Sequence, residues 1–201
     1  MVESFLYAHR GQMPVAAFQK RVDEWTPEVS AGGWARVLAQ SADGNSDRDV
    51  VLVAEDDQGI LGLVSGGAAQ GGVDDTTGEV GALYVHPRRH GQGVGRALLR
   101  AAARHLADLG YTELQIGVLS ANRPARAFYE AMGGREIGQG TDDEEGYLLP
   151  LTSTGGQTSP ISRPTTSTPS NRATIRARMT PCPPSIQPRP SDCGHHGGGC
   201  D

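Results

Sequence analysis

The segment from Glu79 to Gly110 holds a strand, a glycine-rich turn and a helix in direct succession, and this order limits the folds open to the chain. Residues 79–85 (EVGALYV) are rich in β-branched and aromatic side chains, which favours a strand. Over residues 95–109 apolar side chains recur every three or four positions, which predicts an amphipathic helix. Gly110 stands where a left-handed glycine commonly ends a helix. The chain must therefore combine a sheet with at least one helix packed on it.

The turn between this strand and helix, residues 86–95 (HPRRHGQGVG), has the composition of an anion-binding site. Three glycines alternate with other residues in it: Gly91, Gly93 and Gly95. Glycine lets a phosphate approach the backbone without meeting a Cβ atom, and the first N–H groups of a helix point outward without intrahelical partners. Arg88 and Arg89 add positive charge beside the turn. An ordinary glycine-rich connection is the alternative, because closely spaced glycines alone are weak evidence.

Three kinds of phosphate-binding turn compete for this segment. A Walker loop ends on Gly-Lys-Ser/Thr, and Lys20, far away in the sequence, is the chain's only lysine. A dinucleotide-binding turn needs G-x-G-x-x-G, whereas Arg96 and Leu98 occupy the positions of the third glycine. Glu113 stands about 20 residues further on, as a ribose-binding acid would, so a nucleotide-dependent oxidoreductase remains an alternative. The chain has a single strand–helix unit at this turn, which favours a third kind.

Composition divides the chain after Leu151. Residues 1–151 carry 13 basic and 21 acidic side chains and no cysteine, so no disulfide framework holds them together. Residues 152–201 hold eight of the 13 prolines and all three cysteines, and consist mostly of Ser, Thr, Pro, Gly and Arg. So little apolar surface does not offset the entropy of ordering. We therefore expect one domain over residues 1–151 and a disordered tail over residues 152–201.

The same composition argues against several classes of partner. No apolar run approaches the roughly 20 residues that span a bilayer, and the segment Met1–Ser4 lacks the features of a signal peptide, so we expect a cytoplasmic protein with no membrane partner. The acidic domain argues against nucleic acid, which needs clustered Lys and Arg. Four potential metal ligands lie near the end of the chain: Cys193, His195, His196 and Cys200. Their spacing fits no standard zinc pattern, so we expect no metal site.

The remaining elements are predicted from periodicity and turn residues. Residues 12–40 favour two helical pieces, broken near Pro27 and Gly32-Gly33. The rest of the domain is predicted as a hairpin (49–65), a glycine-rich loop (66–78), a strand (113–118), a helix capped by Asn122, and two short strands (135–138 and 147–149) joined by an acidic loop (142–145).

Two blocks of sequence, in this order, resemble the GNAT superfamily of N-acetyltransferases. The run from Glu79 to Leu99 resembles motif A of that family, which is a strand, then [Gln/Arg]-x-x-G-x-[G/A], then a helix. Gly93 and Gly95 match its glycines, and His90 stands where the family prefers Gln or Arg. The run from Leu119 to Gly134 (LSANRPARAFYEAMGG) resembles motif B. Two blocks at the right spacing are far more specific than either alone.

The resemblance extends over roughly residues 25–151 and implies an α+β fold with a mixed, mostly antiparallel central sheet flanked by helices. It implies an N-acetyltransferase (EC 2.3.1 class) that uses acetyl-CoA as co-substrate and acts directly on a primary amine of a small molecule or peptide. In this family the third and fourth main strands separate, and the gap receives the pantetheine arm. The residues then expected to bind acetyl-CoA are Leu83, Tyr84, Val85, His90, Gly91, Gln92, Gly93, Val94, Gly95, Arg96 and Asn122.

Two residues are candidates for proton transfer. Tyr129 falls in motif B where the resemblance implies the acid that protonates the leaving thiolate, and a core tyrosine is the alternative. Glu79 lies four residues before Leu83, so alternation along the strand places both on one face unless a bulge intervenes. The resemblance implies Glu79 as the candidate base, because some members of the family carry a catalytic Glu at this place in the strand. A solvated carboxylate, with the amine proton leaving through water, is the alternative. Asn122 caps a helix, hydrogen-bonds pantetheine, or does both.

Three matters stay open at this point. The residues before Tyr7 are too few for the strand and helix with which the family usually begins, so we expect the sheet to lack its first strand. The acceptor amine has no recognisable sequence pattern, and a homodimer is one open assembly. A non-catalytic acyl-CoA-binding module is the alternative function, and it would bind acetyl-CoA without turnover.

Overall fold

The computed structural model describes residues 2–42, 50–69, 75–144, 146–158 and 174–177, in which α-helices precede and interrupt a series of strands. The helices are α1 (Val2–His9), α2 (Val15–Glu24), α3 (Pro27–Ala42), the 3₁₀ turn η1 (Pro87–Arg89), α4 (Val94–Asp108) and α5 (Arg123–Ala131). The strands are β1 (Val50–Asp56), β2 (Gly59–Ala68), β3 (Thr77–Val85), β4 (Glu113–Leu119), β5 (Arg135–Glu144), β6 (Tyr147–Gln157) and β7 (Thr174–Ala177).

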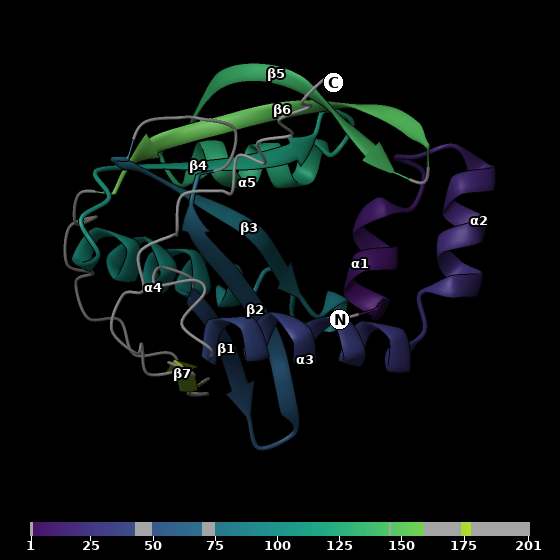
Figure 1. Ribbon diagram of the computed structural model, residues 1–201, viewed down its shortest axis with the longest axis horizontal. Helices are drawn as coiled ribbons and strands as arrows, with labels where there is room; N and C mark the ends of the chain where they lie inside the picture. Colours follow the sequence, from purple (N-terminus) through teal and green to yellow (C-terminus); the bar gives the residue numbers. More distant parts are fainter. Residues whose placement is uncertain (1, 43–49, 70–74, 145, 159–173, 178–201) are drawn as a thin grey trace, which may run out of the picture.

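The strands form one mixed sheet in the order β5-β6-β4-β3-β2-β1-β7 (Figure 1). Within the described ranges β3 and β4 are the one parallel pair, and the other neighbours are antiparallel. A parallel pair needs a long crossover connection, and α4 supplies it. The predicted α+β fold, a mostly antiparallel sheet flanked by helices, is confirmed.

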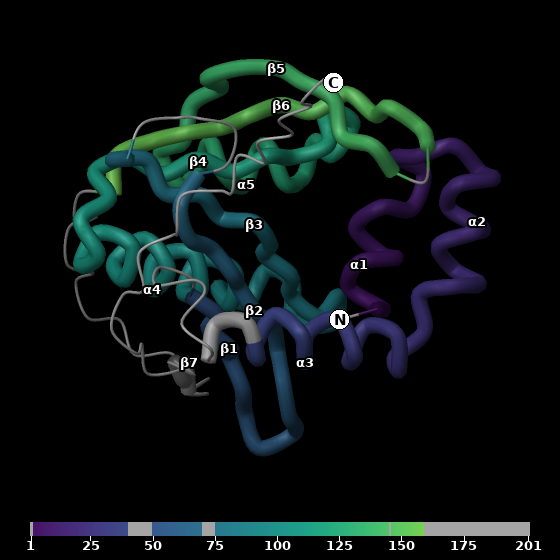
Figure 2. The backbone as a smooth tube through the Cα atoms, in the orientation of Figure 1, coloured from purple at the N-terminus to yellow at the C-terminus, as the bar shows by residue number. Residues whose placement is uncertain are grey.

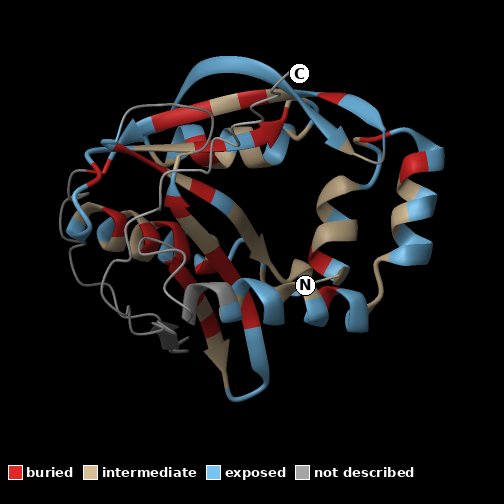
Figure 3. Ribbon diagram, viewed as in Figure 1, coloured by how far each residue is buried: buried red, intermediate tan, exposed pale blue. Residues whose placement is uncertain are grey.

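Helix α4 packs on β1, β2 and β3 through the apolar stripe predicted from the sequence. Leu98, Ala102 and Leu106 are fully buried on this stripe, and Figure 3 shows the buried positions facing the sheet. Each buried leucine contributes about 1.5–3 kcal/mol to folding. Gly110 follows the helix with a φ of 99°, as expected of a glycine at its end. This packing fixes the position of the glycine-rich turn before α4.

Helix α1 lies beside β3, and α1 and α2 are at the opposite side of the view from α4 (Figures 1 and 2). The residues before Tyr7, expected to be too few for both a strand and a helix, belong to the short helix α1. The Phe5 ring lies 6.2 Å from the Tyr84 ring of β3, so this short helix is anchored by tertiary contact. Residues 2–42 hold no strand before β1.

The predicted interruption within residues 12–40 is partly wrong. The helices separate at Trp25 and Thr26, and α3 continues through Gly32-Gly33. Pro27 begins α3, because proline at the first helical position loses no intrahelical hydrogen bond. None of the helices in the described ranges combines the length and apolar character needed to cross a membrane.

The C-terminal strands are longer than predicted. β5 runs through the acidic segment that was expected to be a loop, and the turn after it is made at Gly146, with a φ of 82°. β6 continues past Leu151, the predicted domain boundary, to Gln157, and it buries Thr152 and Thr154. Pairing with β4 on one side and β5 on the other explains why these polar residues are ordered.

The prediction of a disordered tail is therefore wrong for residues 152–157, and also for residues 174–177, which form β7 and pair with β1. The predicted glycine-rich loop is shorter, since β2 reaches Ala68 and β3 begins at Thr77. The potential metal ligands from Cys193 to Cys200 lie outside the described residues.

Candidate active site

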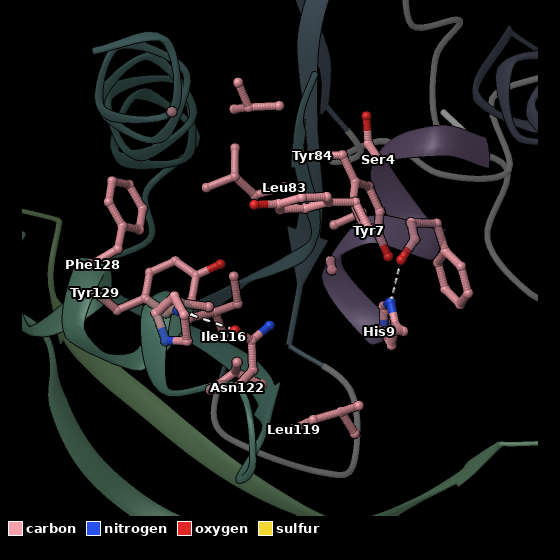
Figure 4. Close-up of a pocket in the computed structure, with 18 of the residues that line it drawn as sticks. Ser4, Tyr7, His9, Leu83, Tyr84, Ile116, Leu119, Asn122, Phe128 and Tyr129 are labelled. Atoms are coloured by element: carbon pink, nitrogen blue, oxygen red, sulfur yellow. Dashed lines mark hydrogen bonds between the residues drawn. The ribbon is translucent and has the colours of Figure 1, made fainter. Parts of the chain in front are cut away.

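A gap in the sheet opens between β3 and β4. The two strands pair at three positions only, from Thr77–Glu113 to Glu79–Gln115, and then separate. A cavity of about 1050 Å³ lies along the separated parts, residues 81–85 of β3 and 116–119 of β4. In Figure 4 the labelled side chains of α5 and of α1 lie on opposite sides of those of β3. The predicted separation of these strands is confirmed, and it leaves one edge of β3 open to the cavity.

One end of the cavity is formed by the N-terminus of α4. Gly93 caps this helix with a φ of 84°, and Gly91 has a φ of 74°, so both occupy the left-handed region that favours glycine. The N–H of Ala97 donates to the carbonyl of Gly93 at 3.0 Å. The preceding N–H groups of the first turn have no carbonyl partner within the helix and are available to an anion.

Gly95 has a packing role. A Cβ atom at this position would lie 3.5 Å from Cγ2 of Val85 and 3.6 Å from Cζ of Phe128. The first turn of α4 therefore sits closely between β3 and α5, which holds its N–H groups beside the open edge of β3.

Most of the residues predicted to bind acetyl-CoA line this cavity: Leu83, Tyr84, Val85, His90, Gly91, Gly93, Val94, Gly95, Arg96 and Asn122. Gln92 is the exception, because its side chain is exposed and its Nε2 donates to the Arg88 carbonyl at 3.0 Å. Arg89 is paired with residues of the β1–β2 hairpin. Its Nη2 lies 2.9 Å from an Asp56 carboxylate oxygen and donates a hydrogen bond to the Gln58 side-chain oxygen. The basic side chain that lines the cavity at the helix turn without such a partner is Arg96.

His90 is tied to the cavity wall. Its Nε2 lies 3.0 Å from the carbonyl oxygen of Val85, and this contact makes that nitrogen the donor. Its ring meets the Tyr7 ring edge-on, with centroids 5.3 Å apart. His90 therefore connects the glycine-rich turn to β3 and to α1.

Tyr129 projects from α5 into the cavity (Figure 4). The side chain is 8% exposed, and within the described residues no hydrogen bond holds its hydroxyl. Burial raises the pKa of Tyr129 well above its usual value, and nearby Tyr84 adds to the rise. The hydroxyl therefore stays protonated at neutral pH and faces the cavity as a donor.

Asn122 begins α5 as predicted. Its side-chain oxygen accepts a hydrogen bond from the N–H of Ala125 at 3.1 Å, while the residue also lines the cavity. The cap is thus observed, and the side-chain amide N–H₂ remains on the cavity side of the helix start (Figure 4).

Glu79 lies outside the cavity lining. The register of β2 against β3 shifts so that Ser65 faces Ala82 and Gly66 faces Val80, which leaves Gly81 as a bulge. A bulge reverses the alternation. The exception allowed for in the sequence analysis, a bulge, is therefore present, and Glu79 and Leu83 do not share a face. Gln115 donates to the Glu79 carboxylate at 3.4 Å.

Sequence reasoning missed the side chain of Tyr84, which was expected to contribute main-chain atoms. The pKa of Tyr84 is raised to about 12. Burial contributes most, the charges of Glu144 and Asp142 add to the rise, and the charge of Arg21 opposes it. Both carboxylates line the cavity from β5. No sequence signal pointed to them, since this segment was expected to be a loop.

Helix α1 and the turn after it supply the other unpredicted wall: Ser4, Phe5, Tyr7, Ala8, His9 and Gln12. The rings of Phe5 and His9 stack at 3.9 Å, and His9 Nδ1 lies 2.8 Å from the Phe5 carbonyl oxygen. Both contacts lie within α1 and hold the His9 ring against Phe5 at the cavity wall.

A sequence profile of the acetyltransferase (GNAT) family matches residues 16–134, more than half of the chain. The uncharacterized N-acetyltransferase YuaI of Bacillus subtilis is 31% identical over 100 residues, which cover 49% of this chain and 57% of that protein. The mycothiol acetyltransferase of Segniliparus rotundus is 32% identical over 114 residues, which cover 55% and 42%. The chain thus spans about half the length of these two curated relatives.

Among solved structures, the PaiA N-acetyltransferase of Thermoplasma acidophilum in complex with coenzyme A has a TM-score of 0.53 at 18% identity. The superposition covers 75% of this chain and 86% of that one. At this identity the likeness shows the shared fold.

Proposed function

The chain belongs to the GNAT acetyltransferase family, and we propose that it is an N-acetyltransferase that transfers the acetyl group of acetyl-CoA directly to a primary amine. The observation that carries the proposal is the gap between β3 and β4, which opens a strand edge beside the N-terminus of α4. A helix N-terminus suits a pyrophosphate, and an open strand edge suits an amide-rich arm.

The residues present fit this co-substrate. The first-turn N–H groups of α4, with Gly91 and Gly93 in left-handed conformations, are proposed to hold the pyrophosphate. Arg96 adds one positive charge there. The main chain of residues 83–85 is proposed to pair with the pantetheine arm, and the Asn122 amide to donate to it. The backbone N–H near Leu83 or Tyr84 is proposed to polarise the thioester carbonyl.

Tyr129 is the proposed acid. In the reaction the amine nitrogen bonds to the acetyl carbonyl carbon, the C–S bond breaks, and the departing thiolate takes the proton of Tyr129. The proton lost by the amine passes to water, and water returns one to Tyr129. The buried, unionised hydroxyl facing the cavity supports this role. Glu79 lies outside the cavity, so we propose water as the carrier of the amine proton.

Calorimetry with coenzyme A and acetyl-CoA, followed by release of free thiol across a panel of amines, tests the proposal. Arg96→Gln should weaken coenzyme A binding about three- to fivefold. Arg104→Gln is the matched control, because Arg104 is exposed on the same helix outside the cavity and its loss should change nothing. Binding without turnover of any amine would favour a non-catalytic acyl-CoA-binding module. Saturable NAD binding without coenzyme A binding would overturn both.

A further inference from the structure

The two ends of the cavity carry opposite charge. The end at α4 has Arg96 and the helix N-terminus, as described above. The other end has Asp142 and Glu144 of β5, facing α1. These two carboxylates stand two positions apart on one strand, so they share a face.

Arg21 neutralises part of this acidic end from outside the cavity. Its Nη2 lies 2.5 Å from Oε2 of Glu144, and its guanidinium lies over the rings of Phe5 and Trp25, at 5.5 and 5.1 Å from their centroids. Arg21 does not line the cavity. In the part of the chain that the structure describes, no hydrogen bond or ion pair holds the carboxylate of Asp142, so one negative charge remains.

Two further groups at this end of the cavity are consistent with a negative potential there. The Oε1 atom of Gln12 is buried, has no hydrogen-bond partner among the described residues, and belongs to a residue of the cavity wall. The hydroxyl of Tyr84 experiences a negative field, since Glu144 affects its pKa more strongly than Arg21 does. On the facing wall of α1, the His9 ring is held by Phe5, and the Tyr7 ring contacts that of His90. Acceptor atoms predominate, which suits a ligand rich in N–H donors.

The segments that form this end, α1 and β5, both lie outside residues 16–134, which match the family. The residues that match the family therefore include the α4 end of the cavity, whereas the acidic end is formed by residues outside the match. We propose that the acceptor is a small diamine or polyamine, whose second, unreacted ammonium group is held by Asp142 together with Glu144 and Gln12. The inference rests on the proposed function.

A diamine acceptor bound in this way carries one neutral nitrogen, which attacks, and one charged nitrogen, which is held by the carboxylates. The amine that attacks must be neutral, so it gains nothing from a carboxylate, whereas a distal ammonium keeps its charge near neutral pH. An acceptor with a distal carboxylate would be repelled by Asp142. The wall formed by α1 at this end favours a small molecule over a protein surface.

Three acceptors of equal length test the proposal on the full chain with saturating acetyl-CoA: 1,5-diaminopentane, pentylamine and 5-aminopentanoate. We expect kcat/KM to fall in that order, with the diamine at least about tenfold above pentylamine after correction for its two amines. Added salt should reduce the ratio of kcat/KM for the diamine to kcat/KM for pentylamine, because salt screens the attraction between the ammonium and the carboxylates. Pentylamine equal to or better than the diamine, or a blocked lysine peptide better than both, would overturn the proposal.

Asp142→Asn should lower kcat/KM for the diamine about fivefold and leave that for pentylamine within about twofold. Asp143→Asn is the matched control, because Asp143 lies outside the cavity and accepts a hydrogen bond from the N–H of Gly146 at 2.8 Å. Equal losses for both acceptors in Asp142→Asn would contradict a charge-reading role.

Failure of the proposed function has a different signature. If no amine is turned over, the activity is wrong, and calorimetry of the three compounds on the coenzyme A complex then decides the charge preference. Diamine binding that is tighter than pentylamine binding and weakens in Asp142→Asn supports the acidic site. Equal or absent binding of the diamine overturns it.

Discussion

Removal of one oxygen atom from Tyr129 is the sharpest test of the proposed chemistry. General acids contribute about 100- to 10,000-fold to the rates of enzymes. A thiol has a pKa near 8.5 and tyrosine one near 10, so a full proton transfer from tyrosine to a thiolate is already uphill by about 2 kcal/mol. Burial raises the pKa of Tyr129 and makes the transfer less favourable still. We therefore expect Tyr129→Phe to lower kcat about 100-fold, the small end of that range.

The same substitution should leave the fold intact. The ring of Tyr129 packs edge-on against Phe128, with centroids 5.2 Å apart, and phenylalanine keeps this contact. Since no hydrogen bond within the described residues holds the hydroxyl, the free energy of unfolding should change by less than about 0.5 kcal/mol. Chemical denaturation followed by fluorescence measures this value.

The assay is release of free thiol at saturating acetyl-CoA and amine, which reports kcat. Tyr111→Phe is the control, because Tyr111 is a buried tyrosine outside the cavity and its loss should leave kcat unchanged. A Tyr129→Phe enzyme that keeps kcat within about threefold of the parent would refute the acid assignment. An equal loss in Tyr111→Phe would show that the effect is structural.

Further outcomes follow from other positions. Glu79→Gln should keep kcat within about threefold, measured by thiol release, because Glu79 lies outside the cavity. Asn122→Ala should cost about 0.5–2 kcal/mol of stability in denaturant titrations, since the cap of α5 is lost, and should also raise the KM for acetyl-CoA. Leu106→Ala should lower the free energy of unfolding by about 2–5 kcal/mol, because Leu106 of α4 is fully buried in the core. The free energy of unfolding should stay level up to about pH 10 and fall between pH 10 and 12, because the unfolded chain releases the Tyr84 proton first while burial holds the folded pKa at about 12. In Tyr84→Phe that fall should be shallower.

The glycine-rich turn could be predicted because its chemistry depends on the backbone. Gly91 and Gly93 adopt positive φ angles that other residues rarely accept, so the sequence there is constrained by conformation. The apolar stripe of α4 could also be predicted from the sequence, because Leu98 and Leu106 recur at helical spacing and are both buried. Together these features locate the strand, the turn and the helix that form one end of the cavity.

The bulge at Gly81 could not be predicted, and it changed the interpretation of Glu79. Strand periodicity assumes strict alternation, and one extra residue reverses every side chain beyond it. The prediction of a loop over the acidic run in β5 failed for another reason. Asp142 and Glu144 have low strand propensity, and the pairing of β5 with β6 outweighs this propensity.

The α4 end of the cavity could be predicted from the sequence and the acidic end could not, because the α4 end presents main-chain groups and the acidic end presents side chains. Main-chain N–H groups at the start of α4 tolerate many side chains, so a family can share that end while its sequences diverge. The proposed acceptor site at the acidic end uses the side chains of Asp142, Glu144 and Gln12. These side chains reach this end of the cavity from β5 and from the turn after α1, which are about 130 residues apart in the chain. Such a site exists only after folding, because no local pattern in either segment specifies it. On the proposed function, donor recognition is therefore inherited with the turn, whereas we propose that acceptor recognition is set by the side chains that β5 and the turn after α1 bring to the far end.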